Sequence, residues 1–310
     1  MFCSTIIATI GRSTLTRTVE SVLSQAFNEE NHEVIVVNDS GESLPPASWQ
    51  GSERVQVIQT NRRERSVARN TGAAAARGRY LHFLDDDDWL APGALSHFWN
   101  LGQQTQAGWL YGASQLVDRE QRPLIRLQHG LEGNCFLQVM AGEWIPLQSS
   151  LIEASAFFQV GGFNTRISGP EDIDLLRRIA HTNELAETAN LVAYIVMGME
   201  GSTTDYANHH KASQWSREQI LESPGVFKAL QKSATSPFWK GRLARVFLTS
   251  LVWNMQRGKL WSAAGRGFAG LASILIAGKA TLSFDYWRAL SRPYASSTFA
   301  QGFREVSSVL

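Results

Sequence analysis

The residues from Phe83 to Leu90 read FLDDDDWL, so an apolar run predicted to be a buried strand ends in four consecutive aspartates. Four adjacent carboxylates repel one another, and a stable fold therefore needs cations, backbone donors or solvent around them. Open α/β sheets bind ligands at the carboxyl ends of their strands, which is where these carboxylates stand. Because strand residues alternate in direction, we expect Asp85 and Asp87 to share one side while Asp86 points elsewhere. A solvated acidic turn that caps the next helix is the alternative.

Short Val- and Ile-rich runs alternate with helical patterns through the first half of the chain, which is typical of β-α-β units. The predicted strands span residues 2–10, 33–38, 55–59 and 80–84, and the predicted helices between them span 14–25 and 66–76. Further strands are expected at 110–117 and 149–153, and a helix is expected to begin near Pro170. The sequence predicts the α/β class, with a Rossmann-like, mostly parallel central sheet covered by helices on both faces.

The composition is that of a globular protein, with 44% hydrophobic and 18% charged residues over 310 positions, which argues against disorder. Only Cys3 and Cys135 are present, so a disulfide framework is not expected and a reducing, cytoplasmic setting is favoured. Neither cysteine stands in a His-paired motif, and we expect both to be small buried hydrophobes.

Charge is distributed unevenly along the chain. Residues 225–310 contain 12 Lys and Arg but only 2 Asp and Glu, whereas the whole chain contains 29 and 28. We therefore predict two parts, 1–224 and a basic, Trp-containing helical extension at 225–310. An acidic body suits metal handling, and a basic extension suits an anionic surface.

The extension contains two strongly apolar helical segments, 247–253 and 268–277. Arg257, Lys259, Arg266 and Lys279 interrupt the stretch, which therefore falls short of the roughly 20 uninterrupted apolar residues of a membrane span. We expect an interfacial helix pair and peripheral association with the inner face of a membrane. Packing of these helices on the catalytic domain is the alternative.

Asp39 ends another early strand, after VIVVN, and would lie at the same sheet edge as the aspartate quartet if the strands are parallel. There it can accept hydrogen bonds from a base or ribose, although a plain Asx turn before Gly41 would also explain it.

A basic loop that contains Arg62, Arg63 and Arg65 leads into the Ala-rich helix that carries Arg69. Arg side chains and helix-start amides suit phosphates, whereas Arg62 and Arg63 are expected to be solvated.

The segment GPEDIDLLRR, from Gly169 to Arg178, begins a helix with acidic residues. The helix dipole partly explains them. A carboxylate fixed at a helix start can also remove the proton from an attacking hydroxyl.

These motifs occur in the order and spacing of the inverting glycosyltransferase family 2, whose members have a GT-A fold. The chain resembles that family over about residues 2–205. The most specific elements are the strand end VVND, the segment ARNTG from Ala68 to Gly72, the segment FLDDDDWL, and GGF from Gly161 followed by Glu171 and Asp172.

The resemblance implies roles for individual residues. It identifies Asp172 as the general base, with Glu171 and Trp144 beside the acceptor, and it identifies Asp87 and Asp85 as ligands of Mg²⁺ or Mn²⁺. It assigns contacts with the nucleotide sugar to Thr9, Gly11, Arg12, Asp39, Arg65, Arg69, Asp85 and Asp86.

The chain also departs from the family pattern. Its first strand ends in Ala8-Thr9-Ile10-Gly11-Arg12, where relatives commonly have Pro-Thr-Tyr-Asn-Arg. The Arg or His that many relatives carry after the last strand is replaced here, and Ser202 and Thr203 are left as phosphate contacts. His209 and His210 follow, and both are expected to be surface histidines.

We therefore expect an inverting glycosyltransferase that moves a hexosyl or N-acetylhexosaminyl group from a nucleotide-diphosphate sugar to a hydroxyl of a glycan or lipid-linked glycan, in polysaccharide biosynthesis. By resemblance the donor is a UDP-sugar, and no nucleic acid partner is expected. A sugar-nucleotide nucleotidyltransferase is one alternative, although Gly11-Arg12-Ser13 poorly replaces its Gly-rich phosphate loop. A non-catalytic sugar-nucleotide binding subunit is another, although the presence of Asp87 and Asp172 argues against it.

Overall fold

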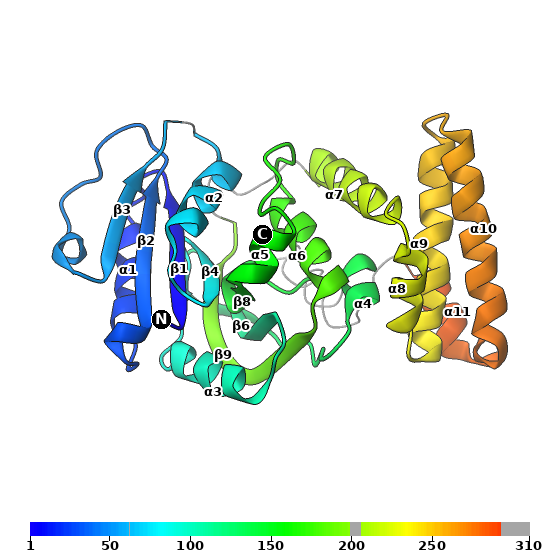
Figure 1. Cartoon of the computed structure of the whole chain (residues 1–310), viewed down its shortest axis with the longest axis horizontal. Coiled ribbons are helices and arrows are strands. Elements are labelled where there is room, and N and C mark those ends of the chain that lie inside the picture. Colours follow the sequence, from blue (N-terminus) through cyan, green and yellow to red (C-terminus); the bar gives the residue numbers. More distant parts are fainter. Residues whose placement is uncertain (62, 199–205, 293–310) are drawn as a thin grey trace. The chain divides into compact units, whose positions relative to one another are not determined.

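The computed structural model describes residues 1–61, 63–198 and 206–292 (Figure 1). These residues form two compact units. The first comprises Met1–Gly133 and Ile145–Ala212, and the second comprises Asn134–Trp144 together with the described residues from Ser213 onward. The short segment Asn134–Trp144 thus belongs to the same unit as the later helices. The domain boundary between 224 and 225 stays a prediction.

A nine-stranded sheet forms the centre of the first unit, in the order β3-β2-β1-β4-β8-β6-β9-β5, with β7 paired to β6 off this path. The strands are β1 Cys3–Thr9, β2 His32–Asn38, β3 Val55–Gln59, β4 Tyr80–Asp85, β5 Trp89–Leu90, β6 Trp109–Val117, β7 Pro123–Leu127, β8 Ser150–Glu153 and β9 Leu185–Val196. Parallel pairing runs from β3 through β2 and β1 to β4, and β6 and β9 are also parallel. The other pairs are antiparallel, so the expected parallel order holds for the first four strands and the sheet is mixed beyond β4.

The helices alternate with the strands in the first half of the chain and dominate after residue 206. They are α1 Leu15–Leu23, α2 Arg65–Ala75, α3 Ala94–Gln104, α4 Phe136–Met140, α5 Ala154–Gln159, α6 Glu171–Thr182, α7 Tyr206–Leu221, α8 Val226–Lys232, α9 Pro237–Met255, α10 Leu260–Ala277 and α11 Phe284–Ser291. Short 3-10 helices span Glu29–Asn31, Ser48–Gly51, Leu147–Ser149 and Gly278–Leu282.

Both faces of the parallel strands are covered, as the continuous apolar runs predicted. Ile7 belongs to a buried cluster with residues of α1 and α3. Its neighbour Ile6 faces α2 instead, because a Cβ at Gly72 of that helix would lie 2.4 Å from Ile6 Cγ2. Successive strand residues therefore pack on opposite sides, and Gly72 permits the close approach of α2 to the sheet.

The register of these strands brings their carboxyl ends to one edge. Asp85 at the end of β4 pairs with Ala8 of β1, and Thr9 of β1 pairs with Asn38 of β2. Asp39, the next residue, donates its amide to the Thr9 carbonyl at 2.8 Å. The expected placement of Asp39 and the aspartate quartet at one sheet edge is confirmed.

In the second unit, α9 and α10 form an antiparallel hairpin with α11 packed beside it (Figure 1). Among the described residues, one helical stretch, Leu260–Leu282, is long and apolar enough by length and composition to cross a membrane, and only 22% of its most apolar window is buried. The expectation from the sequence concerned uninterrupted apolar residues, and Arg266 and Lys279 do interrupt this stretch, although its average composition reaches that of a membrane span.

Both cysteines are free and buried, as predicted. Burial raises the pKa of the Cys3 thiol to about 12, so this thiol is inert at neutral pH.

Candidate active site

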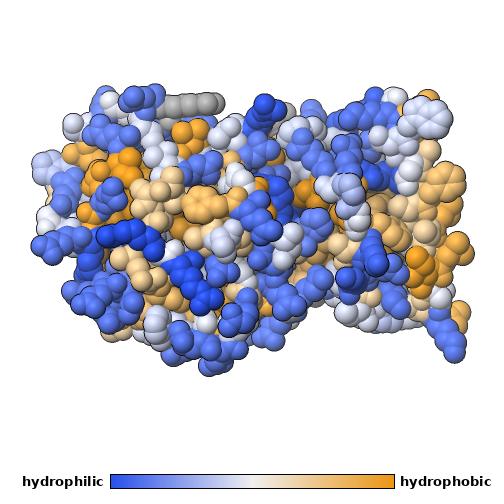
Figure 2. Space-filling view, viewed as in Figure 1, coloured by the Kyte–Doolittle hydropathy of each residue, from blue (hydrophilic) through white to orange (hydrophobic). Residues whose placement is uncertain are grey.

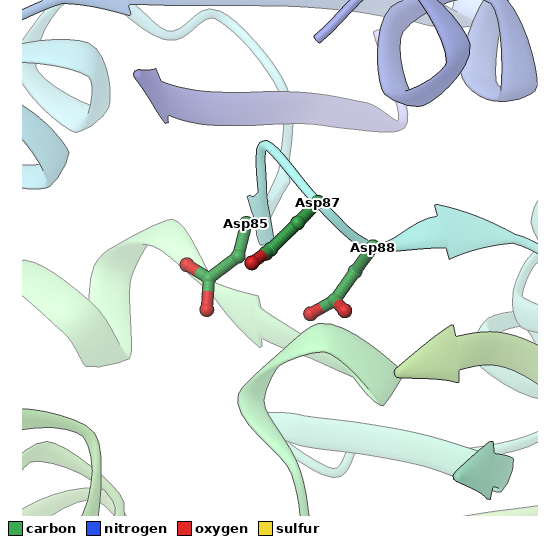
Figure 3. A group of neighbouring side chains, drawn as sticks. All are labelled: Asp85, Asp87 and Asp88. Atoms are coloured by element: carbon green, nitrogen blue, oxygen red, sulfur yellow. The ribbon is translucent and has the colours of Figure 1, made fainter. Parts of the chain in front are cut away.

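The aspartate quartet forms a tight turn at the end of β4. The strand ends at Asp85, and the Asp88 amide donates to the Asp85 carbonyl at 3.1 Å. Asp86 and Asp88 are only 2% and 1% exposed, so the alternative of a solvated acidic turn does not describe the structure. Three of the carboxylates, those of Asp85, Asp87 and Asp88, point into the same region (Figure 3).

Asp86 points away from that group and holds the loop after β1. Thr9 Oγ1 donates to Asp86 Oδ2 at 2.6 Å, and Arg12 Nη1 lies 2.6 Å from Asp86 Oδ1. The Gly11 amide donates to Thr9 Oγ1 at 2.9 Å, and its positive φ of 83° suits glycine. Four residues predicted from the family resemblance are thus joined in one hydrogen-bonded chain, which positions Arg12 beside the quartet.

The other three carboxylates form a candidate metal centre. Each of Asp85, Asp87 and Asp88 offers one oxygen, and these oxygens all lie within 4.8 Å of one another. Asp88 Oδ1 accepts the Val196 amide at 2.8 Å, while its buried Oδ2 makes no hydrogen bond within the described residues. A hard divalent ion fits this set, because carboxylate oxygens are the ligands it prefers and an ion would satisfy the orphaned oxygen.

The pKa values of the three carboxyls diverge. Burial and the neighbouring Asp85 raise the pKa of Asp87 to about 6, and the same causes raise the pKa of Asp88 well above its ordinary value. Burial would also raise the pKa of Asp85, but Arg69 and Arg65 outweigh it and lower that pKa. Two of the three groups thus resist ionisation until a cation offsets their charge.

Arg69 links this acidic group to the start of α6. Its Nη2 lies 2.6 Å from Asp85 Oδ1 and its Nη1 lies 2.9 Å from Glu171 Oε1. Arg65 Nη1 approaches the same Glu171 oxygen at 3.3 Å. The amides at the start of α2 already bond Glu64, whose carboxylate accepts from Ser66 and Val67 at 2.8 Å. The expected phosphate site at that helix start is therefore occupied by a side chain, and only the arginines face the carboxylates.

Asp172 stands at the start of α6, next to the buried Glu171. Its Oδ1 accepts the Ile173 amide at 2.7 Å. Burial raises the pKa of Asp172 to about 6, with repulsion from Glu171 adding to the effect and Arg69 opposing it. A carboxyl with that pKa is ionised at neutral pH and basic enough to accept a proton from a hydroxyl during a reaction.

Asp39 is buried beside β1 and β3, where Thr60 Oγ1 donates to its Oδ1 at 2.8 Å. The Asx turn that was the alternative explanation belongs to Asn38, whose Oδ1 accepts the Ser40 amide at 3.1 Å. Asn38 therefore makes the Asx turn, whereas Asp39 has one carboxylate oxygen bonded to Thr60.

Three side chains at this site were not predicted as site residues from the sequence. Gln148 Nε2 donates to Asp85 Oδ2 at 2.8 Å, and Arg17 Nη2 donates to the Asp87 carbonyl at 2.6 Å. No local pattern marks either residue, because each comes from a segment distant in the sequence. Asp88 is the third residue. Strand alternation predicted only Asp85 and Asp87 on one side, but the chain turns after Asp85 and the alternation ends there.

Several predicted residues cannot be assigned to this site from the described structure. Trp144 belongs to the second unit, so its acceptor role stays a prediction. Ser202, Thr203 and Arg62 lie outside the described residues. His209 is half-buried, and burial lowers its pKa while Glu171 opposes the effect.

Comparisons with known proteins identify the family of the chain. The family model for glycosyl transferase family 2 matches residues 4–161. The chain is 34% identical over 103 residues to the poly(ribitol-phosphate) β-N-acetylglucosaminyltransferase TarP of Staphylococcus aureus, which is 32% of each protein. It is 23% identical over 213 residues to an uncharacterized glycosyltransferase of Haemophilus influenzae, covering 66% of this chain and 72% of that one.

Solved structures show the same fold. Residues 1–349 of TarS from S. aureus, in complex with UDP-GlcNAc, superpose with a TM-score of 0.63 at 13% identity over 85% of this chain and 89% of that chain. The expected GT-A fold is therefore confirmed. The chain matches only about a third of the length of TarP and, at 29%, a similar share of an uncharacterized glycosyltransferase of Rickettsia bellii.

Proposed function

The chain belongs to glycosyl transferase family 2, and on that premise we propose that it transfers a sugar, with inversion, from a nucleotide-diphosphate sugar to a hydroxyl of a glycan or lipid-linked glycan. The observation that carries the proposal is the arrangement around Arg69, which joins Asp85 of the carboxylate group to Glu171, the neighbour of Asp172. One buried guanidinium thereby holds the carboxylate proposed to lie on the diphosphate side and the neighbour of the proposed base.

Asp172 acts as the general base in this proposal. As the acceptor oxygen attacks the anomeric carbon, its proton passes to the Asp172 carboxylate and the bond from that carbon to the diphosphate oxygen breaks on the opposite face. One displacement inverts the anomeric configuration. The raised pKa of Asp172, caused chiefly by burial, supports this role, because a general base works best when its pKa lies near the pH of the reaction.

Asp85, Asp87 and Asp88 would hold a Mg²⁺ or Mn²⁺ ion, whose charge offsets that of the departing diphosphate. Arg12 is oriented beside these groups by Asp86, with Nη1 also 3.6 Å from Asp87 Oδ2. Asp39 would receive the ribose or base, since it is a buried carboxylate at the same sheet edge.

A UDP-sugar is the donor we propose, with a hexosyl or N-acetylhexosaminyl group as the group transferred. The support is by likeness: the TarS structure contains UDP-GlcNAc, and TarP is a β-N-acetylglucosaminyltransferase. A lipid-linked acceptor would place the enzyme at the inner face of a membrane, which agrees with the basic, apolar helices of the second unit.

The test is a screen of the purified chain against nucleotide sugars, with and without Mn²⁺, in which release of the nucleoside diphosphate is measured. We expect release from a UDP-sugar that requires the metal and is lost in Asp172→Asn. Failure of all nucleotide sugars to react would overturn the proposal. Consumption of a nucleoside triphosphate and a sugar phosphate, with pyrophosphate released, would assign the chain to the nucleotidyltransferases instead.

A further inference from the structure

Helix α10 and the turn that follows it expose a row of large apolar side chains. Trp261, Phe268, Leu275 and Leu282 stand seven residues apart and are 93%, 74%, 80% and 86% exposed, and Leu271 lies among them. A seven-residue spacing returns to nearly the same side of a helix, so Trp261, Phe268 and Leu275 share one side of α10, here called the α10 face. Leu282 is exposed in the 3-10 turn that follows. Figure 2 shows apolar surface gathered along α10.

The opposite side of α10 carries small residues. Ala263, Gly270, Ser273 and Ala277 are the buried positions of this helix. A Cβ at Gly270 would lie 2.9 Å from Leu248 Cδ2 of α9, so glycine is what allows the two helices to approach closely. A helix of a soluble monomer normally turns its large apolar residues inward. Here the arrangement is reversed, and the large residues are left for a partner outside the unit.

A buried polar group fixes which side of α10 faces outward. Arg266 Nη1 donates to the Leu221 carbonyl at 2.9 Å, and its Nε lies 3.5 Å from Glu218 Oε2. The same Glu218 oxygen accepts from Ser250 Oγ at 2.5 Å and from Asn254 Nδ2 at 3.0 Å. A span across a bilayer would carry this ion pair and its neighbours on α7 and α9 into hydrocarbon, so a helix lying in the plane of the surface fits better.

The charges around the α10 face identify the kind of partner. Between residues 255 and 292 the chain has six basic residues and a single acidic one, Asp285. Arg257 and Lys259 precede α10, and Lys279 follows it; all three are exposed. A second copy of the chain would bring like charges together on the same face, whereas an anionic lipid surface would complement them.

We propose that the α10 face is a docking surface for an anionic phospholipid bilayer, with α10 parallel to the membrane and its large apolar side chains inserted among the acyl chains. Trp261 suits this position, because its ring is at home at the boundary of headgroups and hydrocarbon. The α10 face itself is inferred independently of the proposed function. Only the purpose of membrane binding, which is access to a lipid-linked acceptor, rests on that function.

Vesicle flotation of the full chain tests the proposal. We expect the protein to float with vesicles that contain phosphatidylglycerol and to remain unbound with pure phosphatidylcholine. Phe268→Ser/Leu275→Ser should reduce the bound fraction at least about tenfold, since two inserted side chains are lost. Phe158→Ser, which changes a 53% exposed apolar residue of the first unit, is the matched control and should float like the parent.

A charge variant tests the second half of the argument. Lys259→Glu/Lys279→Glu should abolish the preference for anionic vesicles, and added salt should weaken binding of the parent protein. Circular dichroism and thermal unfolding of each variant establish that it is folded, and the exposure of the changed residues makes unfolding unexpected.

Two results would overturn the proposal. One is failure of the folded parent protein to float with anionic vesicles. The other is a dimer in analytical ultracentrifugation that Phe268→Ser/Leu275→Ser dissociates while flotation is unchanged, which would assign the α10 face to a second copy. Hydrolysis of the nucleotide sugar is measured on the same samples. Flotation without hydrolysis would leave this inference standing and reject the proposed function, and hydrolysis without flotation would do the reverse.

Discussion

Arg69 and Asp85 are joined by a charge-assisted hydrogen bond of 2.6 Å between Nη2 and Oδ1, with the arginine side chain only 5% exposed. The other terminal nitrogen of Arg69 is engaged by Glu171. A planar guanidinium can serve two carboxylates at once, whereas an ammonium group acts as a point charge. One residue therefore holds the carboxylate group at the end of β4 in fixed relation to Glu171 at the start of α6.

Removal of Arg69 should damage both stability and activity. Arg69→Ala leaves Asp85 and Glu171 without their cation, and we expect a loss of about 3–5 kcal/mol in the free energy of unfolding. Arg69→Lys should recover part of that stability but remain at least about tenfold lower in kcat/KM, because it cannot hold both partners. Urea denaturation and steady-state kinetics measure the two effects.

The control for Arg69 is Arg79→Ala. Arg79 also pairs with a carboxylate, Glu153, at 3.2 Å, but its side chain is 44% exposed. Removal of the Arg79 side chain should lower the free energy of unfolding by less than about 1 kcal/mol and leave kcat unchanged. Equal effects of Arg69→Ala and Arg79→Ala would contradict the bridging role.

Asp172→Asn should lower turnover by a factor on the order of 10² to 10⁴ with donor affinity nearly unchanged, because the amide occupies the same space but accepts no proton. Single-turnover kinetics and donor calorimetry separate the two quantities. Asp174→Asn, two residues further along α6, is the control: it loses the ion pair with Arg178 at 2.6 Å and should reduce stability while the folded fraction stays active. An active Asp172→Asn would remove this residue from the role of base.

The pH profile should reflect Asp172. Because its pKa is raised to about 6, the proportion of ionised base falls as the pH drops through that value, and kcat should decline below about pH 6. Saturating Mn²⁺ and donor keep the metal ligands charged during the measurement. A rate that is independent of pH between 5 and 8, or one that rises as the pH falls, would speak against a carboxylate base with this pKa.

Metal binding should stabilise the folded chain. Mn²⁺ at about 100 times its dissociation constant would add about 2.7 kcal/mol to the free energy of unfolding, which is measured as a rise in the melting temperature. Asp87→Ala should abolish that rise, since a third of the carboxylate group is lost. Asp118→Ala, which removes a carboxylate paired with the exposed Arg122, should leave the response to Mn²⁺ intact. Equal rises in Asp87→Ala and the parent would place the ion elsewhere.

His82 should make stability depend on pH. This buried ring lies 2.9 Å from the Gln148 carbonyl, and burial lowers its pKa from 6.5 to about 4. Between those values the unfolded chain binds the proton and the folded chain does not, so stability is present above about pH 6.5 and falls as the pH drops towards 4, by up to about 3 kcal/mol. Urea unfolding at pH 7 and 5 measures the change. His82→Asn should show a smaller difference between the two pH values, and an unchanged difference would exclude His82 as its source.

Local patterns in the sequence sufficed for much of the fold. The strand predicted at 55–59 coincides with β3, and the strand and helix predicted around residues 80–84 and 66–76 differ from β4 and α2 by a single residue at each changed end. Alternating β and α periodicity is a property of neighbouring residues, so it can be read without knowing which segments meet. The quartet of aspartates was equally visible, as was the surplus of positive charge after residue 225.

Only the tertiary structure decided which distant residues meet. Gln148 reaches Asp85 because β8 pairs antiparallel with β4, and Arg69 reaches Glu171 because α2 and α6 converge on the same sheet edge. Asp88 joins the carboxylate group because the chain turns immediately after Asp85, which strand alternation does not predict. The outward direction of Phe268 and Leu275 likewise depends on the close packing of Gly270 against α9. Residue spacing specifies the faces of each element, but the partner of each face is set by packing between elements far apart in the chain.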